Sequence, residues 1–275
     1  NRLNNIYPKN AVIMAPLAGY TDLTYRRSMR RHGCLFAFTE MVDTGALIYA
    51  NKHTRKFLER GKEETWLGIQ IVGGKIEEID QAVTILNEHN FDVLDLNLGC
   101  PTHKVASKGK GAGLTKNIDL VSRMIELMVK RSKFPISAKI RIQDSVNPEL
   151  TIKLAKTIEA VGAKALTIHG RLMKDVYSGP CFAEIISEVR KNLKIQVIAN
   201  GGVTGIESYK KLKENSGCSE IMVARGSMGN PWIFEEINKA EQLIPTSEEL
   251  AEEIKKHILE MVTHYDANFG FNVAR

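Results

Sequence analysis

Residues 136–170 have the sequence ISAKIRIQDSVNPELTIKLAKTIEAVGAKALTIHG, which predicts a strand, a turn, a helix and a second strand. The two apolar runs, ISAKIRI and ALTIHG, are short and nearly continuous, as strands buried on both faces are. Pro148 is placed to start the helix between them, and Gly162 is placed to end it. The stretch therefore contains one strand–helix unit and the strand of the next.

The same unit recurs on both sides of this stretch. Eight apolar runs lie mostly about 25 to 30 residues apart, the spacing of β–α units. They are AVIMAP (from Ala11), LFAFTEM (Leu35), WLGIQIVG (Trp66), VLDLNLG (Val93), ISAKIRI (Ile136), ALTIHG (Ala165), IQVIANGG (Ile195) and EIMVARG (Glu220). Between two of them, Asn117 can cap a helix whose apolar face is Ile118, Val121, Ile125 and Met128. Eight units in 275 residues predict an α/β fold, a (β/α)8 TIM barrel, with an open doubly wound sheet as the alternative.

After Trp232 the repeating pattern stops. Pro245 interrupts the chain, and Thr246 with Glu249 forms a capping-box pattern before a helix that we expect to run to about His264. No strand follows this helix, so it is not a ninth barrel unit. We therefore predict a TIM-barrel catalytic domain over 1–240 and a short, apparently truncated C-terminal helical segment over 241–275.

The composition is that of a folded water-soluble protein, with 43% hydrophobic and 25% charged residues. No apolar run is long enough to cross a bilayer, and the N-terminus has no secretion-signal pattern. Four scattered cysteines, Cys34, Cys100, Cys181 and Cys218, form no C-x-x-C pair, which argues against a metal site or disulfides and favours the cytoplasm. The net charge of +6 permits a polyanionic partner without requiring one.

Unusual residues end most of the apolar runs, where TIM barrels carry their function. They are Met14-Ala15-Pro16, Gln70, Asn97 to Pro101, Lys139 and Arg141, His169-Gly170-Arg171, Asn200-Gly201-Gly202 and Ala224-Arg225-Gly226. Lys139 is either half of a buried ion pair or a site lysine, and His169 is either a core residue or a ligand contact. The glycine-bearing ends of the last two strands, with Arg225, are suited to bind a phosphate.

Glycine and lysine alternate in Lys108-Gly109-Lys110-Gly111-Ala112-Gly113. This loop matches neither G-x-x-x-x-G-K-[ST] nor G-x-G-x-x-G, so it is not a known phosphate loop. We expect a mobile loop over the active site, whose lysines either contact an anionic substrate or are simply solvated.

These residues, in this order, resemble the FMN-dependent tRNA-dihydrouridine synthase family. The matching strings are MAPLAGYTD (14–22), TEM (39–41), LDLNLGCPTHKV (94–105), AKIR (138–141), IHGR (168–171), YSGP (177–180), NGG (200–202) and ARGSMGNPW (224–232). The likeness covers residues 11 to about 240 and is weaker beyond. It implies reduction of uridines in tRNA to 5,6-dihydrouridine, with hydride passing from flavin N5 to uracil C6 and a proton passing from Cys100 to C5.

The resemblance also implies roles for individual residues. Pro16, Leu17, Ala18, Gln70, Lys139, His169, Asn200, Gly201, Gly202, Ala224 and Arg225 would bind the flavin, Cys100 would be the catalytic acid, and Asn97, Arg171 and Lys104 would contact the substrate. NADPH is the implied reductant, tRNA the implied partner, and a monomer the expected state. Further candidates for the RNA backbone are Arg26, Arg30, Lys108, Lys110 and Lys174, whereas Arg27 and Arg31 fit an ordinary solvated helix face.

Two departures from the family pattern are visible. Leu172-Met173-Lys174 follow HGR where Thr-Arg is usual, and the C-terminal helical region, expected to start an RNA-binding domain, is shorter than usual, which predicts weaker RNA affinity. Three other functions remain alternatives. They are a dihydroorotate dehydrogenase-like FMN barrel acting on a free pyrimidine or another small molecule, an aldolase-type barrel with Lys139 as a Schiff base, and a binding protein without catalysis.

Overall fold

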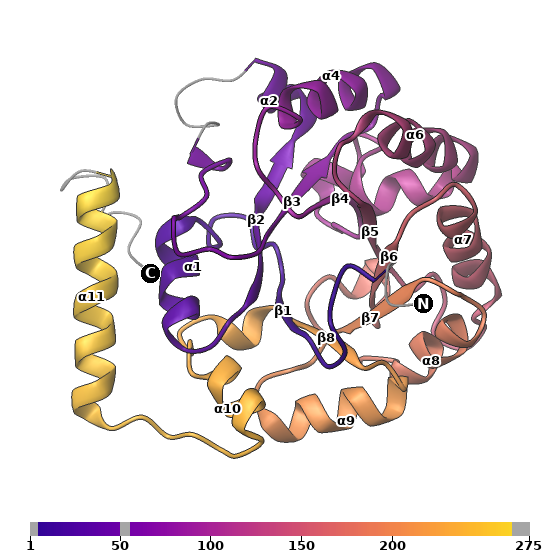
Figure 1. Ribbon diagram of the computed structural model, residues 1–275. Helices are drawn as coiled ribbons and strands as arrows, with labels where there is room; N and C mark the ends of the chain where they lie inside the picture. Colours follow the sequence, from indigo (N-terminus) through magenta and orange to yellow (C-terminus); the bar gives the residue numbers. More distant parts are fainter. Residues whose placement is uncertain (1–4, 50–55, 266–275) are drawn as a thin grey trace.

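Eight parallel strands form a closed barrel in the computed structural model, which describes residues 5–49 and 56–265 (Figure 1). Each strand pairs with the next along the chain, and β8 pairs with β1 to close the sheet. The strands are β1 (Val12–Met14), β2 (Phe36–Asp43), β3 (Leu67–Val72), β4 (Val93–Leu98), β5 (Ile136–Arg141), β6 (Ala165–His169), β7 (Gln196–Asn200) and β8 (Glu220–Val223). The predicted (β/α)8 TIM barrel is confirmed, and an open doubly wound sheet is excluded.

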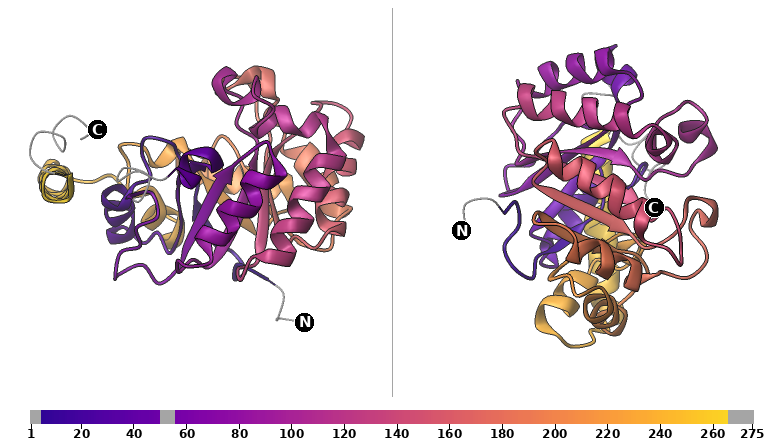
Figure 2. Two further views of the ribbon diagram at one scale, coloured as in Figure 1. Left: turned by 90° about the horizontal axis from the view of Figure 1, so that it is seen from above. Right: turned by 90° about the vertical axis from the view of Figure 1, so that its right-hand side faces the viewer.

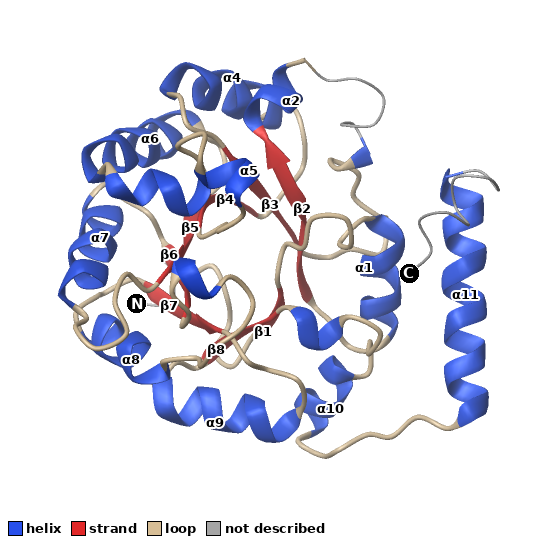
Figure 3. Ribbon diagram, turned by 180° about the vertical axis from the view of Figure 1, so that it is seen from behind, coloured by secondary structure: helices blue, strands red, loops and turns tan. Residues whose placement is uncertain are grey.

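Helices surround the barrel, as Figure 3 shows from the opposite side. They are α1 (Leu23–Arg31), α2 (Thr44–Ile48), α4 (Ile76–Leu86), α6 (Ile118–Arg131), α7 (Glu149–Ala160), α8 (Ala183–Lys191), α9 (Ile206–Ser216) and α10 (Ile233–Lys239). Shorter helices lie in loops that follow strands: α5 (His103–Ala106), η1 (Gly111–Lys116), η2 (Met173–Asp175) and η3 (Arg225–Ser227). No helix in the described residues is long and apolar enough to span a membrane.

The helix boundaries follow the capping residues seen in the sequence. The side chain of Asn117 accepts a backbone N–H of the first turn of α6 at 3.0 Å. Pro148 directly precedes α7, and Gly162 follows it with a φ of 102°. Thr246 N donates to Glu249 Oε2 at 2.8 Å while Glu249 N donates to Thr246 Oγ1 at 3.2 Å, which confirms the predicted capping box.

Alternation along β5 decides which side chains face the barrel interior. Ile136, Ala138 and Ile140 belong to the apolar core between the sheet and the helices. Because successive side chains point to opposite faces of a strand, Lys139 and Arg141 point into the barrel. The register pairs Lys139 with Asn97 of β4, so two polar side chains lie next to each other inside.

The N-terminal segment closes the end of the barrel at which the strands begin (Figure 2). Tyr7, 2% exposed, donates its backbone N–H to Gln196 Oε1 at 3.0 Å and accepts from Gln196 Nε2 at 2.8 Å. Its ring lies 5.2 Å from Trp66 and 6.0 Å from Phe36, measured between centroids. These three aromatic side chains cover the end of the barrel at which the strands begin. A ligand therefore reaches the barrel interior from the opposite end.

The last helix, α11 (Ser247–Tyr265), lies outside the ring alongside α1 (Figures 1 and 2). Glu253 of α11 accepts from Ser28 Oγ at 2.6 Å and pairs with Arg31 at 2.6 Å. Arg31 also pairs with Glu260 at 2.8 Å, so it joins two helices instead of lying on a merely solvated face. The helical segment after the barrel is confirmed, and the domain boundary between residues 240 and 241 stays a prediction.

Candidate active site

A cavity of about 680 Å³ opens at the C-terminal ends of the strands. Each of the eight strands contributes to its wall through its last residues or the loop that follows. Every predicted site residue except Lys104 lines it: Pro16, Leu17, Ala18, Gln70, Asn97, Cys100, Lys139, His169, Arg171, Asn200, Gly201, Gly202, Ala224 and Arg225. The volume is in the ordinary range for a cofactor or small-molecule site.

Asn97 shapes the turn that presents Cys100. Its side-chain Oδ1 accepts the backbone N–H of Gly99 at 3.1 Å and that of Cys100 at 2.9 Å. Its Nδ2 donates to Gln70 Oε1 at 2.7 Å, so both the oxygen and the nitrogen of the Asn97 amide are hydrogen-bonded. The half-buried Cys100 thiol lies 3.3 Å from Thr102 Oγ1 at the cavity wall. The position of the thiol is therefore set by a turn that Asn97 holds in place.

Arg141 braces the same turn from the next strand. Although only 3% exposed, it donates Nε to Gly99 O at 2.9 Å, Nη1 to Leu172 O at 3.0 Å and Nη2 to Val176 O at 2.6 Å. Burial lowers the pKa of Arg141, but a guanidinium stays protonated at physiological pH. No role for Arg141 was predicted from the sequence. Its position two residues after Lys139 on one strand was the available signal.

Lys139 has no hydrogen bond or ion pair with any other residue in the described part of the chain. Burial, and then the charge of Arg141, lower its pKa to about 8, against the opposing effects of Asp95 and Cys100. A buried structural ion pair, one of the two roles expected for this lysine, is therefore not present there. The ammonium borders the cavity and is available to a ligand.

His169 is a neutral hydrogen-bond acceptor in this site. Burial first, and then the surrounding cations, lower its pKa far below the ordinary value. Arg171 Nη1 lies 3.2 Å from His169 Nε2, and a guanidinium only donates, so Nε2 accepts and Nδ1 carries the ring proton. Arg171 Nε donates to Gly179 O at 2.9 Å, which ties the strand end to the loop after β6.

Glycines that follow β7 and β8 form part of the cavity wall. Gly201 and Gly202 have φ values of 131° and 73°, which side-chain-bearing residues rarely adopt. A Cβ at Gly202 would make only ordinary van der Waals contacts, the nearest being Cys181 Cβ at 3.8 Å, and Gly202 lines the cavity. A Cβ at Gly226 would lie 2.2 Å from Val203 O, so glycine lets the two loops approach closely. Their backbone N–H groups make this wall suited to an anion.

Arg225 supplies a fixed positive charge beside these glycines. Its Nη2 donates to Tyr177 O at 2.7 Å, and its guanidinium lies 5.5 Å from the centre of the Tyr177 ring. Asn200 Nδ2 donates to Met222 O at 2.8 Å, which holds the ends of β7 and β8 together. The neighbouring part of the wall is formed by Pro16, Leu17 and Ala18 after β1, the strand that pairs with β8, and there Leu17 N donates to Thr21 Oγ1 at 3.0 Å.

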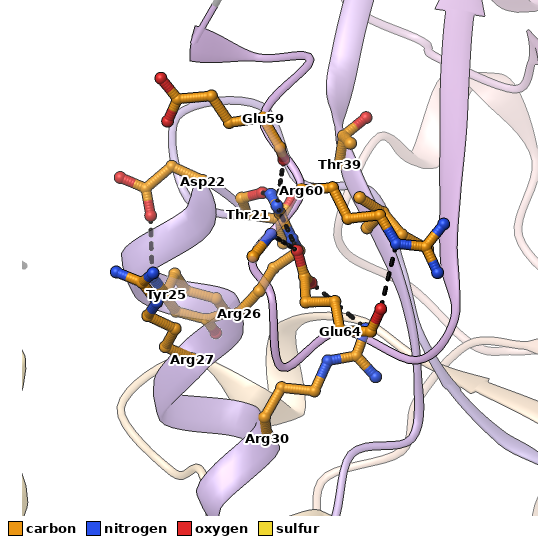
Figure 4. A network of polar contacts seen from close by, with 12 residues as sticks. Thr21, Asp22, Tyr25, Arg26, Arg27, Arg30, Thr39, Glu59, Arg60 and Glu64 are labelled. Atoms are coloured by element: carbon orange, nitrogen blue, oxygen red, sulfur yellow. Dashed lines mark hydrogen bonds and ion pairs between the residues drawn. The ribbon is translucent and has the colours of Figure 1, made fainter. Parts of the chain in front are cut away.

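Two of the predicted RNA-binding arginines are structural. Arg26 is 1% exposed and places Nε 2.8 Å and Nη2 2.9 Å from the two carboxylate oxygens of Glu64 (Figure 4). Arg30 also contacts Glu64, at 3.2 Å, and donates to Trp66 O at 2.5 Å. The Arg26 guanidinium is buried, and in Arg30 both Nη atoms are engaged with protein acceptors while Nε is buried without a partner in the described residues. Neither side chain can bind a phosphate, so both predictions were wrong. Arg27 lies at the surface, paired with Glu63 at 2.7 Å.

The remaining basic candidates divide by exposure. Lys104, Lys108 and Lys174 are exposed, and Lys104 lies on α5, directly after the Cys100 turn but outside the cavity wall. Lys110 is instead paired with Asp43 at 2.7 Å. The lysines that remain accessible near the cavity are therefore Lys104, Lys108 and Lys174.

Two of the three glycines in residues 108–113, Gly111 and Gly113, allow close packing, whereas a Cβ at Gly109 would meet no heavy atom within 4 Å. Residues from Gly111 onward form η1, and Ala112 N donates to Cys100 O at 3.0 Å. A Cβ at Gly111 would lie 2.9 Å from Cys100 O, and one at Gly113 would lie 2.3 Å from Ala106 O. The second half of the expected mobile loop is thus a short helix packed under the Cys100 turn.

The described residues contain no cluster of three or more metal-ligating side chains. All four cysteines are free, with Cys34 and Cys218 buried and Cys100 and Cys181 partly buried. Burial raises the pKa of Cys34 to about 12 and that of Cys218 to about 11, so both are inert thiols.

Known proteins resemble this chain over its full length. The family model described as dihydrouridine synthase (Dus) matches residues 13–275. "tRNA-dihydrouridine synthase B" of Pasteurella multocida is 32% identical, over all of this chain and 84% of that protein. A "Probable tRNA-dihydrouridine synthase" of Rickettsia conorii is 30% identical, over all of this chain and 85% of that protein.

One solved structure supports the fold independently. Histamine dehydrogenase from Rhizobium sp. 4-9 superposes with a TM-score of 0.63 at 11% sequence identity, covering 90% of this chain and 48% of that one. At this identity the likeness concerns the barrel architecture alone. Because the family model matches nearly the whole chain and full-length relatives reach 32% identity, the chain belongs to the dihydrouridine synthase family.

Proposed function

We propose that this protein reduces specific uridines in tRNA to 5,6-dihydrouridine, with flavin mononucleotide bound in the cavity and NADPH as the reductant. Family membership and the names of its relatives support the reaction. The observation that carries the proposal is one cavity with a thiol, Cys100, and an ammonium, Lys139, in its wall. A proton donor and a cation beside one pocket suit the reduction of a polarised double bond.

The cavity residues fit a flavin mononucleotide. Lys139 and Gln70 lie where they can bind the carbonyl-bearing pyrimidine edge of the ring, and Gln70 keeps one amide hydrogen beyond its bond to Asp95. Gly202 and Arg225 provide a backbone donor and a charge for the phosphate. Neutral His169 lies between these two ends of the cavity wall and can bind the hydroxyl chain.

When bound, the flavin supplies a hydride from N5 to uracil C6. Negative charge then develops toward uracil C5 and O4, and Cys100 donates the thiol proton to C5. The positive charge of Lys139 would stabilise negative charge on the pyrimidine edge of the flavin, and a lowered dielectric constant inside the barrel would strengthen this interaction. Asn97, through the two backbone N–H groups that its Oδ1 accepts, holds the thiol at the cavity wall.

Two residues are left with donors for the uracil. Asn97 uses one hydrogen of Nδ2 on Gln70 and retains the other. Nη2 of Arg171 has no hydrogen bond in the described residues and lies at the cavity. Both can donate to uracil carbonyl oxygens. We further expect Lys104 to contact a phosphate at the mouth, and the protein to act as a cytoplasmic monomer.

The test is direct reduction of tRNA. Purified protein is supplied with FMN, NADPH and tRNA transcripts that lack modifications, and nucleosides are analysed by mass spectrometry. We expect dihydrouridine, recognised by the added mass of two hydrogens, at a small set of positions, which tRNA from cells lacking the gene would then lose. Turnover of a free pyrimidine with no change in tRNA would favour the dihydroorotate dehydrogenase-like alternative.

The state of Lys139 predicts how flavin binding depends on pH. Since the pKa of Lys139 is about 8, the side chain is charged below that pH and becomes neutral as the pH rises through it. A hydrogen bond from a charged donor contributes about 1.5–3 kcal/mol. The charged fraction of Lys139 falls about 10-fold between pH 7 and 9, so we expect FMN affinity for flavin-free protein to fall by up to about 10-fold over this range.

Fluorescence titration of FMN measures this change. Lys139→Met should bind weakly at every pH, while Lys153→Met, on the exposed face of α7, should keep the native profile. An alkaline loss of affinity that persists in Lys139→Met would assign the titration to another group.

Accessible lysines predict the salt dependence of tRNA binding. Each phosphate neutralised by a lysine contributes a slope of about 0.7–0.9 to the logarithmic plot of affinity against salt. We expect Lys104→Ala to reduce the slope by about 1 and to leave flavin binding intact. Lys191→Ala is the matched control, because Lys191 lies in the last turn of α8 and is paired with Glu188 at 2.6 Å. Equal slopes in the two variants would remove Lys104 from the tRNA contact surface.

A further inference from the structure

A buried carboxylate that the proposed reaction does not use lies inside the barrel. Asp95 of β4 is 2% exposed and stands two residues before Asn97, so both side chains point inward. Its Oδ1 accepts from Ser137 Oγ at 2.6 Å, and its Oδ2 accepts from Gln70 Nε2 at 2.7 Å. Burying a charge is costly, and two neutral hydrogen bonds offset that cost incompletely. Its presence in the core therefore calls for a physical explanation.

The hydrogen bonds of Asp95 continue to the Cys100 turn as a single chain. Asp95 accepts from Gln70, Gln70 accepts from Asn97, and Asn97 accepts from the backbone N–H of Cys100. A carboxylate can only accept and a backbone N–H can only donate, so both ends of the chain have fixed polarity. Only one orientation of the two intervening amides satisfies both ends. If either amide flipped, a donor would face a donor or an acceptor would face an acceptor.

We propose that Asp95 is a positioning residue, which orients the amides of Gln70 and Asn97 so that the turn bearing Cys100 is held with its thiol at the cavity. The inference rests on the proposed function, in which Cys100 donates a proton to uracil. It assigns Asp95 no contact with flavin or substrate. Asp95 acts through Gln70 and Asn97.

The charge of Asp95 agrees with this arrangement. Burial raises its pKa to about 6, while the bonds from Ser137 and Gln70 and the charge of Lys139 act in the opposite direction. Burial, and then the negative charge of Asp95, raise the pKa of Tyr7. Above about pH 6 the carboxylate is ionised and both oxygens accept, as the chain requires. Lys139 and Asp95 stabilise each other's charged forms across the cavity floor.

Measuring the two half-reactions separately distinguishes a positioning role of Asp95 from a general structural role. Reduction of bound flavin by NADPH needs no acid from Cys100, whereas reduction of tRNA uridine by the prereduced protein does. We expect Asp95→Leu, which keeps the side-chain branching but removes both acceptors, to slow the second half-reaction about 10²-fold, as a small misplacement of a reacting group does. The first half-reaction should change less than threefold. Glu220→Gln is the matched control, a buried barrel carboxylate outside the chain, and should leave both rates unchanged.

A double-mutant cycle tests whether the effect passes through Cys100. In a Cys100→Ala background, Asp95→Leu should cause no further loss, because the group that Asp95 positions is absent. Asp95→Asn should rescue, because Ser137 can accept from the new amino group while the asparagine oxygen still accepts from Gln70. Combining Asp95→Asn with Ser137→Ala should abolish that rescue. Losses that add to Cys100→Ala, or that affect both half-reactions equally, would overturn the proposal.

An observable independent of activity completes the test. Hydrogen exchange of the backbone amides at Gly99 and Cys100 is measured in flavin-free protein by mass spectrometry. Asp95→Leu should accelerate exchange at these amides at least tenfold, and Asp95→Asn should not. Unchanged exchange in Asp95→Leu would overturn the proposal. If the native protein reduced no tRNA, the proposed function would fail, while the exchange measurement would still decide whether Asp95 holds this turn.

Discussion

Replacement of Cys100 by alanine is expected to slow uridine reduction by about 10²- to 10⁴-fold, the usual contribution of a general acid. This corresponds to roughly 3 to 5 kcal/mol of activation free energy. The reason is that, in the proposed reaction, C5 of the uracil must receive a proton as hydride reaches C6, and the proposed donor is the Cys100 thiol on the cavity wall, beside the turn held by Asn97. Alanine keeps that turn, because the backbone N–H remains, and removes the proton.

The measurement is single-turnover reduction of tRNA by prereduced protein from pH 6 to 9. Cys218→Ala is the control, since that thiol is 2% exposed and lies outside the cavity. Flavin binding and tRNA affinity should change little in Cys100→Ala, because the removed sulfur is needed in the transition state only. If Cys100→Ala reduced tRNA at the native rate over this pH range, another group would have to supply the proton.

The barrel was predictable because each strand carries its own signal. In the run ISAKIRI, alternating apolar residues pack on the helices, and the residue out of phase with them, Lys139, points into the barrel. Capping residues in the sequence also predicted where helices begin, as at Asn117 and Thr246. The cavity residues could be found for the same reason, since strands that end at one edge bring their last residues together.

Long-range partners could not be read from the sequence. Arg26 and Arg30 share a helix with Arg27, and nothing local separates them, yet two are engaged with buried Glu64 and one is at the surface. The partner, Glu64, is 38 residues from Arg26 in the chain. The partners of Arg141 could not be predicted either, because the carbonyl groups that it binds belong to loops whose path is set only in the closed barrel.

Replacement of Arg26 by methionine is expected to lower the free energy of unfolding by about 3–5 kcal/mol, the cost of leaving one charge of a buried pair without its partner. The side chains of Arg26 and Glu64 are 1% and 0% exposed. Arg26 also donates to Thr21 O at 3.0 Å and to Glu59 O at 2.7 Å, so three residues, Thr21, Glu59 and Glu64, lose a common donor (Figure 4). Chemical denaturation followed by circular dichroism measures the change.

The pair should also respond to acid. Burial alone would raise the pKa of Glu64, but the hydrogen bond and charge of Arg26 outweigh it, and the net pKa is lowered from 4.5. A carboxylate with a lowered pKa stabilises the fold above its ordinary pKa and loses that contribution as the pH falls through the lowered value. The native protein should therefore lose stability relative to Arg26→Met below about pH 4.

Two variants identify the cause of the loss. Arg27→Met breaks the exposed pair with Glu63 and should cost only about 0–1 kcal/mol. Removing both charges, in Arg26→Met with Glu64→Leu, should cost less than Arg26→Met alone, because no unpaired charge remains buried. If Arg26→Met and Arg27→Met unfolded at the same denaturant concentration, the buried pair would contribute no more than a surface pair. The β1–α1 loop, which lines the cavity proposed to hold the flavin, would then be held by its other contacts, such as that of Leu17 N with Thr21 Oγ1.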